Sequence, residues 1–146
     1  MGKGEMVLLA PAAVLALWTL MMLLWTAVTR LSGMAKSGVD LKTAPPGGRG
    51  INLEEILPAS ANWKSHNYTH LVEQPTVFYA VIVILHLASG VTQLTIGLAW
   101  AYVALRIAHS LWQALVNTIP VRFTLFLLST ACLLILTIKA VMLTFA

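Results

Sequence analysis

The chain has 146 residues, of which 59% are hydrophobic and only 10% are charged, with nine Lys and Arg against five Asp and Glu. Soluble domains contain about 45–50% apolar and about 25% charged residues, so this composition excludes a soluble globular domain and, equally, a disordered chain. A net charge of +4 spread along the chain does not make a nucleic-acid-binding surface. The composition predicts an integral membrane protein with a single domain, residues 1–146, and with membrane lipid as a partner.

Four segments are long and apolar enough to cross a membrane as helices. A helical span needs about 20 mostly apolar residues, because each residue adds about 1.5 Å across a hydrocarbon core about 30 Å thick. The segments cover about residues 6–29, 71–89, 92–112 and 121–143. The first has Glu5 in its flank and no small-residue cleavage site after it, so we interpret it as a retained helix and not as a signal peptide. The sequence therefore predicts an all-α, four-transmembrane-helix bundle with up-down topology.

The connections between these segments differ greatly in length. Residues 89–91 allow only a tight turn, and residues 117–120 form a short turn before the fourth segment. The long connection covers about residues 30–70, and its Pro-Pro-Gly-Gly stretch at 45–48 interrupts regular structure. The start of this connection, up to Lys42, could continue the first helix beyond the membrane.

The distribution of Lys and Arg predicts the orientation. The side with the long connection carries Arg30, Lys36, Lys42, Arg49, Lys64 and Arg122. The opposite side carries only Lys3 and Lys139. Because Lys and Arg are enriched in short cytoplasmic loops, we expect the long connection to face the cytoplasm and both termini to be non-cytoplasmic.

Polar residues inside the spans follow a helical pattern. At about 100° per residue, the polar residues of the third segment fall within an arc of about 60°. They are Tyr102, Arg106, His109 and Gln113. A second face of the same helix carries small residues suited to close helix packing. These are Gly97, Ala101, Ala104 and Ala108.

The second segment begins with a further polar set. His66, His70 and Glu73 share one helical face, and Asn67 lies beside them. With Arg122 at the start of the fourth segment, three helix ends meet at one membrane face. Ionisable residues in a span usually face the bundle interior and serve function. We expect a site for a small anionic or zwitterionic ligand and for a lipophilic small molecule that arrives from the lipid.

Other interpretations of these residues remain open. Glu73 could pair with Arg106 and simply join two helices, and Arg122 could be an interfacial anchor. His66 and His70 could be solvated, or they could bind zinc or iron together with Glu73. No second such cluster exists and the chain has one cysteine, Cys132, so we assign no metal.

Two stretches resemble the MAPEG family, the membrane-associated proteins in eicosanoid and glutathione metabolism, and the resemblance extends over the whole chain. They are residues 67–78 (NYTHLVEQPTVF) and 102–123 (YVALRIAHSLWQALVNTIPVRF). The family's Glu, followed shortly by Pro and an aromatic residue, is matched by Glu73, Pro75 and Phe78. Its two arginines are matched by Arg106 and Arg122. The chain is most similar to bacterial members, which implies a bacterial inner membrane protein.

The resemblance implies a homotrimer that binds glutathione as co-substrate between subunits, with Arg106 and Arg122 as catalytic residues and Glu73 among the ligand-binding ones. The implied activity is a glutathione-dependent transferase or peroxidase acting on lipophilic electrophiles. Glutathione-using members have Arg and Asn where this chain has His66 and His70, and a neutral His lacks the bidentate grip of Arg on a carboxylate. This difference favours the alternative, a non-enzymatic membrane protein of the same fold that binds a lipid or a partner.

Overall fold

A computed structural model describes residues 6–40 and 46–145. These residues form four long helices, α1 (Leu9–Lys36), α2 (Ala59–Leu87), α3 (Gln93–Leu115) and α4 (Ile119–Thr144), and two short 3-10 helices, η1 (Met6–Leu8) and η2 (Gly50–Leu53), without a strand. All four long helices have the length and composition to cross a membrane. The predicted all-α, four-helix fold is therefore confirmed. Several residues used for the expected orientation and turns lie outside the described residues: Lys3, Glu5, Lys42 and Pro45.

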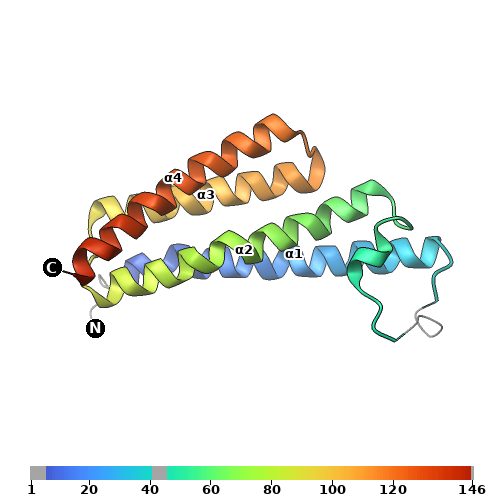
Figure 1. Ribbon diagram of the computed structural model, residues 1–146, viewed down its shortest axis with the longest axis horizontal. Helices are drawn as coiled ribbons and strands as arrows, with labels where there is room; N and C mark the ends of the chain where they lie inside the picture. Colours follow the sequence, from blue (N-terminus) through green and yellow to red (C-terminus); the bar gives the residue numbers. More distant parts are fainter. Residues whose placement is uncertain (1–5, 41–45, 146) are drawn as a thin grey trace.

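The helices run alternately up and down and form two pairs (Figure 1). α1 packs along α2, and α3 packs along α4. The start of α1 and the end of α4 lie at one end of the bundle, where the two pairs come together, and the long connection lies at the other end, towards which the pairs diverge. This divergence places the ends of α2, α3 and α4 around a shared space on the connection side.

The helices extend beyond the spans expected from hydropathy. α1 continues to Lys36, and α2 begins at Ala59, directly after the extended residue Pro58. The first turns of α2 are too polar to count as a span, but no proline interrupts them before Pro75. The non-helical connection is therefore much shorter than residues 30–70. His66 and His70 stand on a helix, and not in a loop.

The four helices share an apolar core that includes Leu15, Phe78, Ile82, Tyr102 and Leu136. Many large apolar side chains point outward instead, as a lipid environment allows. A second, smaller cluster of Met34, Leu57 and Ala61 holds the connection against α1 and α2. The connection is thus packed against the end of the α1–α2 pair.

Candidate functional site

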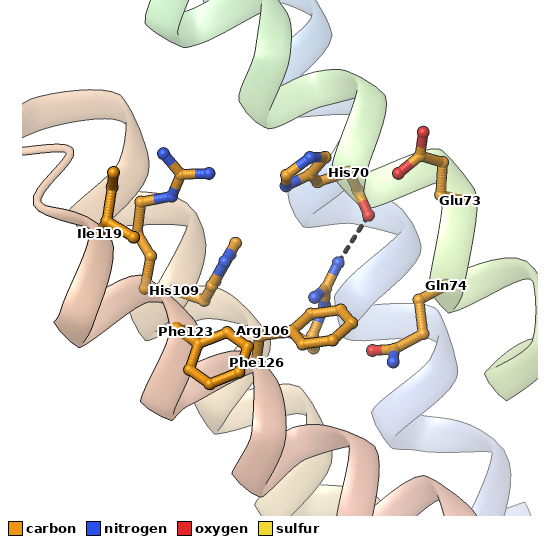
Figure 2. Close-up of a pocket in the computed structure, with 9 residues that line it drawn as sticks. His70, Glu73, Gln74, Arg106, His109, Ile119, Phe123 and Phe126 are labelled. Atoms are coloured by element: carbon orange, nitrogen blue, oxygen red, sulfur yellow. Dashed lines mark hydrogen bonds between the residues drawn. The ribbon is translucent and has the colours of Figure 1, made fainter.

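A cavity of about 320 Å³ lies between α2, α3 and α4 at the end of the bundle nearest the connection (Figure 2). Its lining residues are His70, Glu73, Gln74, Arg106, His109, Ile119, Arg122, Phe123 and Phe126. Five of the nine residues named from the sequence as site candidates therefore meet at one place. A volume near 300 Å³ is at the lower end of the range for small-molecule sites, about 300–1,000 Å³.

Helical spacing explains why these side chains converge. Residues three and four apart lie on one face of a helix. On α3 this places Arg106 and His109 together, and on α2 it groups His70 with the two residues that follow one turn later, Glu73 and Gln74. The three helices thus present polar faces to the same space.

Arg106 is the most deeply buried charge of the site. Its side chain is 1% exposed, and its Nη2 donates a hydrogen bond to the main-chain carbonyl of His70 (Figure 2). Its Nε and Nη1 have no hydrogen-bond partner among the described residues. An unsatisfied buried donor is costly, so a ligand that accepts hydrogen bonds from these two N–H groups would be stabilising here.

Arg122 stands at the start of α4 and is half-buried. Its Nη1 donates to Oδ1 of Asn117 at 2.6 Å, and its Nε has no partner within the described chain. Asn117 has a φ of +61°, a conformation that Asn tolerates better than most residues. The turn before α4 therefore also fixes the direction of the Arg122 guanidinium.

His70 and His109 face each other across the cavity, with ring centroids 6.0 Å apart and ring planes 30° apart (Figure 2). His109 is only 3% exposed, and Gln113, one turn further along α3, lies near His70. Gln113 is buried but does not line the cavity.

Tyr102 lies behind the cavity wall. Its hydroxyl donates to Oε1 of Gln74 at 3.4 Å, and Nε2 of Gln74 donates to the Thr130 hydroxyl at 2.8 Å. This chain of hydrogen bonds joins α3, α2 and α4 and fixes Gln74, which does line the cavity. Tyr102 thus supports the site without facing it.

Asn67 takes part in a junction between three helices. Its Nδ2 donates to the Ser110 hydroxyl at 2.9 Å, and the indole Nε1 of Trp18 donates to the same oxygen at 3.0 Å. Asn67 and Ser110 are fully buried, and neither lines the cavity. The structure therefore separates Asn67 from the other ligand candidates.

His66 belongs to a second cavity of about 610 Å³ on the connection side. Its Nε2 lies 2.9 Å from Oε1 of Glu54, next to η2. His70 and Glu73 line both cavities, so the two spaces adjoin at these residues.

The structure contains neither a metal-binding group at His66, His70 and Glu73 nor an ion pair between Glu73 and Arg106. Within residues 6–40 and 46–145, no group of three or more His, Cys, Asp or Glu side chains could hold a metal ion. Among the residues of these two cavities, His66 forms an ion pair with Glu54. Glu73 is exposed, and Arg106 bonds a carbonyl oxygen in its place.

Sequence reasoning missed four lining residues: Gln74, Ile119, Phe123 and Phe126. Three of them share one face of α4 with Arg122, at positions i, i+4 and i+7 counted from Ile119. That periodicity was available in the sequence, but aromatic and aliphatic residues in an apolar span do not stand out. The apolar wall of the site therefore became visible only with the fold.

These features define a class of protein: a multi-pass membrane protein with four spanning helices and a basic cavity near one membrane face. The model of the MAPEG family matches residues 8–142, and the chain belongs to this family. No curated protein and no solved structure matches the chain.

Proposed function

We propose that the cavity binds glutathione, and that the protein is a glutathione-dependent transferase or peroxidase that acts on lipophilic electrophiles. The observation that carries this proposal is the Arg106 side chain, which is buried and has two N–H groups without a partner in the described chain. A ligand carboxylate can accept a charge-assisted hydrogen bond from either of these donors. Family membership supports the choice of a glutathione-like anion.

The charges around the cavity are complementary to this tripeptide. Glutathione carries two carboxylates and one ammonium group, and the cavity offers Arg106, Arg122 and the carboxylate of Glu73. A guanidinium close to the thiol would also stabilise the thiolate, which is the nucleophilic form. We assign Arg106 and Arg122 to this catalytic role, and Glu73 to the ligand ammonium.

The other wall of the cavity suits an apolar co-substrate. Ile119, Phe123 and Phe126 line it from α4, and Phe123 is 59% exposed on the outside of the bundle. A lipophilic electrophile that diffuses in the membrane can therefore contact this wall from the lipid side. Nucleophile and electrophile would meet where the polar and apolar walls join.

One observation favours a second candidate function. His66, at a position where glutathione-using members have Arg, turns to Glu54 in the second cavity and does not line the first. The first cavity thus lacks one of the cations that such members use. With that cation missing, the protein would be a non-enzymatic member that binds a lipid or a partner through the same apolar wall.

We also propose a homotrimer in a bacterial inner membrane, with the connection in the cytoplasm. The outward face of α3 carries exposed Gly97, Ala104 and Ala108, a surface on which another helix could pack closely. The start of α1 and the end of α4 lie opposite the connection (Figure 1). A reporter fused after Ala146 should therefore be active only outside the cytoplasm, and cytoplasmic activity would reverse the orientation.

Calorimetric titration with glutathione separates the two functions. The wild-type protein in detergent should bind glutathione, and Arg122→Ala should bind it at least about thirtyfold more weakly, since loss of a buried charge contact costs about 2–5 kcal/mol. Lys139→Ala, an exposed change on the same helix, is the matched control. Absence of binding to the wild type would leave the lipid- or partner-binding function.

A further inference from the structure

Gln74 lines the first cavity next to its apolar wall. α2 and α4 both begin at the connection end of the bundle (Figure 1). Gln74 therefore lies one turn deeper than His70, and Phe126 is the deepest of the lining residues of α4. Figure 2 shows the Gln74 side chain extending from α2 into the space that α4 lines from the other side. An amide group thus borders the apolar part of the cavity.

The hydrogen bonds of its neighbours determine which end of this amide is the donor. The Thr130 hydroxyl donates its proton to the Phe126 carbonyl at 2.7 Å. A hydroxyl has a single proton, so Thr130 can only accept from the Gln74 Nε2 that lies 2.8 Å away. The other end of the amide, Oε1, accepts from the Tyr102 hydroxyl at 3.4 Å. Bonds to α3 and α4 therefore hold the amide in one orientation.

This arrangement leaves one amide donor unused. An amide nitrogen carries two N–H groups, and the bond to Thr130 takes one of them. The second N–H of Gln74 has no partner among the described residues, and the side chain lines the cavity. A donor that is already fixed by its neighbours can stabilise charge that develops on a substrate oxygen without first having to reorient.

We propose that Gln74 donates this second N–H to a carbonyl oxygen of the co-substrate, and that the co-substrates are apolar α,β-unsaturated carbonyl compounds. This inference rests on the proposed glutathione function and names the class of electrophile. Arg106 and Arg122 are assigned to glutathione and its thiolate, so Gln74 is left for the oxygen of the second substrate. The apolar wall of α4 faces the rest of that molecule.

The reaction balances in atoms and charge. An electron pair of the glutathione thiolate forms an S–C bond to the β-carbon, and the π electrons of the C=C bond shift towards the carbonyl. The oxygen becomes an enolate anion, which accepts the N–H of Gln74. Water then gives a proton to the α-carbon, and the carbonyl re-forms. The hydroxide that remains takes up the proton lost by the thiol, so glutathione adds across the double bond without an oxidant.

The test compares two electrophiles of similar size with the full-length protein in detergent. Benzylideneacetone has a conjugated carbonyl, whereas benzyl chloride reacts by displacement of chloride and has no oxygen acceptor. Gln74→Leu removes the donor and keeps an apolar side chain of similar size. We expect kcat for benzylideneacetone to fall about a hundredfold, the usual effect of losing one donor to a developing oxyanion, and kcat for benzyl chloride to change little.

Thr130→Val is the matched control, because it breaks the bond to Nε2 of Gln74 but leaves the amide in place. Any loss of rate should then be shared equally by the two electrophiles. Thr137→Val removes a hydroxyl that bonds only within α4 and should leave both rates unchanged. A preference lost as completely in Thr130→Val as in Gln74→Leu would assign the effect to the bridge between helices and overturn the proposed role of Gln74.

A measurement on the wild type needs no variant to fold. The saturated ketone benzylacetone should inhibit conjugation of benzyl chloride more strongly than butylbenzene, which lacks the oxygen. Equal inhibition by the two compounds, or an equal fall of both rates in Gln74→Leu, would overturn the inference. Conjugation of benzyl chloride but not of benzylideneacetone would overturn it and leave the glutathione function intact. No binding of glutathione to the wild type would overturn both proposals.

Discussion

Nη2 of Arg106 donates a hydrogen bond to the main-chain carbonyl of His70, which ties a buried charge of α3 to the backbone of α2. Carbonyls inside a helix normally accept from the N–H four residues later. Pro75 lacks this N–H, so it leaves the Leu71 carbonyl without its helical bond, and a proline ring inside a helix generally bends the preceding turn. The neighbouring His70 carbonyl lies in that turn and can accept from an arginine across the helix interface.

Replacing Arg106 by Lys tests whether the guanidinium shape matters. An ammonium can still bond the His70 carbonyl, but it lacks the further N–H groups that the planar guanidinium presents to an anion. We expect glutathione affinity to fall about tenfold or more, with the thermal unfolding midpoint little changed. Lys139→Arg, an exposed exchange between the same two residue types, is the control. Unchanged affinity in Arg106→Lys would argue against a ligand held by the guanidinium of this residue.

Replacing Pro75 by Ala should stabilise α2 and weaken the site. A proline inside a helix costs about 3 kcal/mol, and alanine restores the N–H that bonds the Leu71 carbonyl. The straightened turn should draw the His70 carbonyl away from Arg106. We expect a higher unfolding midpoint together with weaker glutathione binding. If the midpoint rises and binding is unaffected, the bend is not needed for the site.

Replacing Ser110 by Ala should destabilise the fold without a direct effect on the cavity. Its hydroxyl accepts from both Trp18 and Asn67, so the change leaves two donors unpaired at a fully buried position. Each unsatisfied donor costs about 1–3 kcal/mol. Thr124→Ala, at an exposed threonine that bonds only the backbone of its own helix, should cost much less. Equal unfolding midpoints for the two variants would contradict a structural role for this junction.

The sequence alone was sufficient to predict the helices and much of the site, for physical reasons that differ between residues. Long apolar runs identify spans because lipid leaves the backbone few alternatives to a helix. Arg106, His109 and Arg122 stand out because charge and polarity are rare in such runs. Where polarity was the only signal, it could not separate Asn67, which bonds Ser110, from His70, which lines the cavity.

Other features depend on how the helices are placed in space. The partner of His66 is Glu54, twelve residues away on the connection, and no spacing rule links a helix to a segment with prolines and glycines. The start of α2 at Ala59 was missed because its first turns are polar, although they are helical. Hydropathy identifies the part of a helix that can lie in lipid, whereas the helix itself extends into polar residues wherever its backbone hydrogen bonds continue.

Two glycines, Gly90 and Gly97, distinguish contacts between subunits from contacts within one chain. A Cβ added at Gly90 would meet Leu143 Cδ1 at 2.7 Å and the Leu85 carbonyl oxygen at 3.1 Å, whereas one added at Gly97 would meet nothing within 4 Å. Gly90→Ala should therefore destabilise the single chain. Gly97→Leu should leave the fold intact or stabilise α3 by up to about 1 kcal/mol, since glycine is a poor helix former.

If the small-residue face of α3 packs on a neighbouring subunit, the same Leu must keep the two backbones apart. Native mass spectrometry in mild detergent should then show a trimer for the wild type and smaller species for Gly97→Leu, with the helix content unchanged by circular dichroism. A trimer in both would place the contact on another face. A wild type that is monomeric under these conditions would exclude the trimer itself, and the cavity of a single chain would then have to bind its ligand without a neighbour.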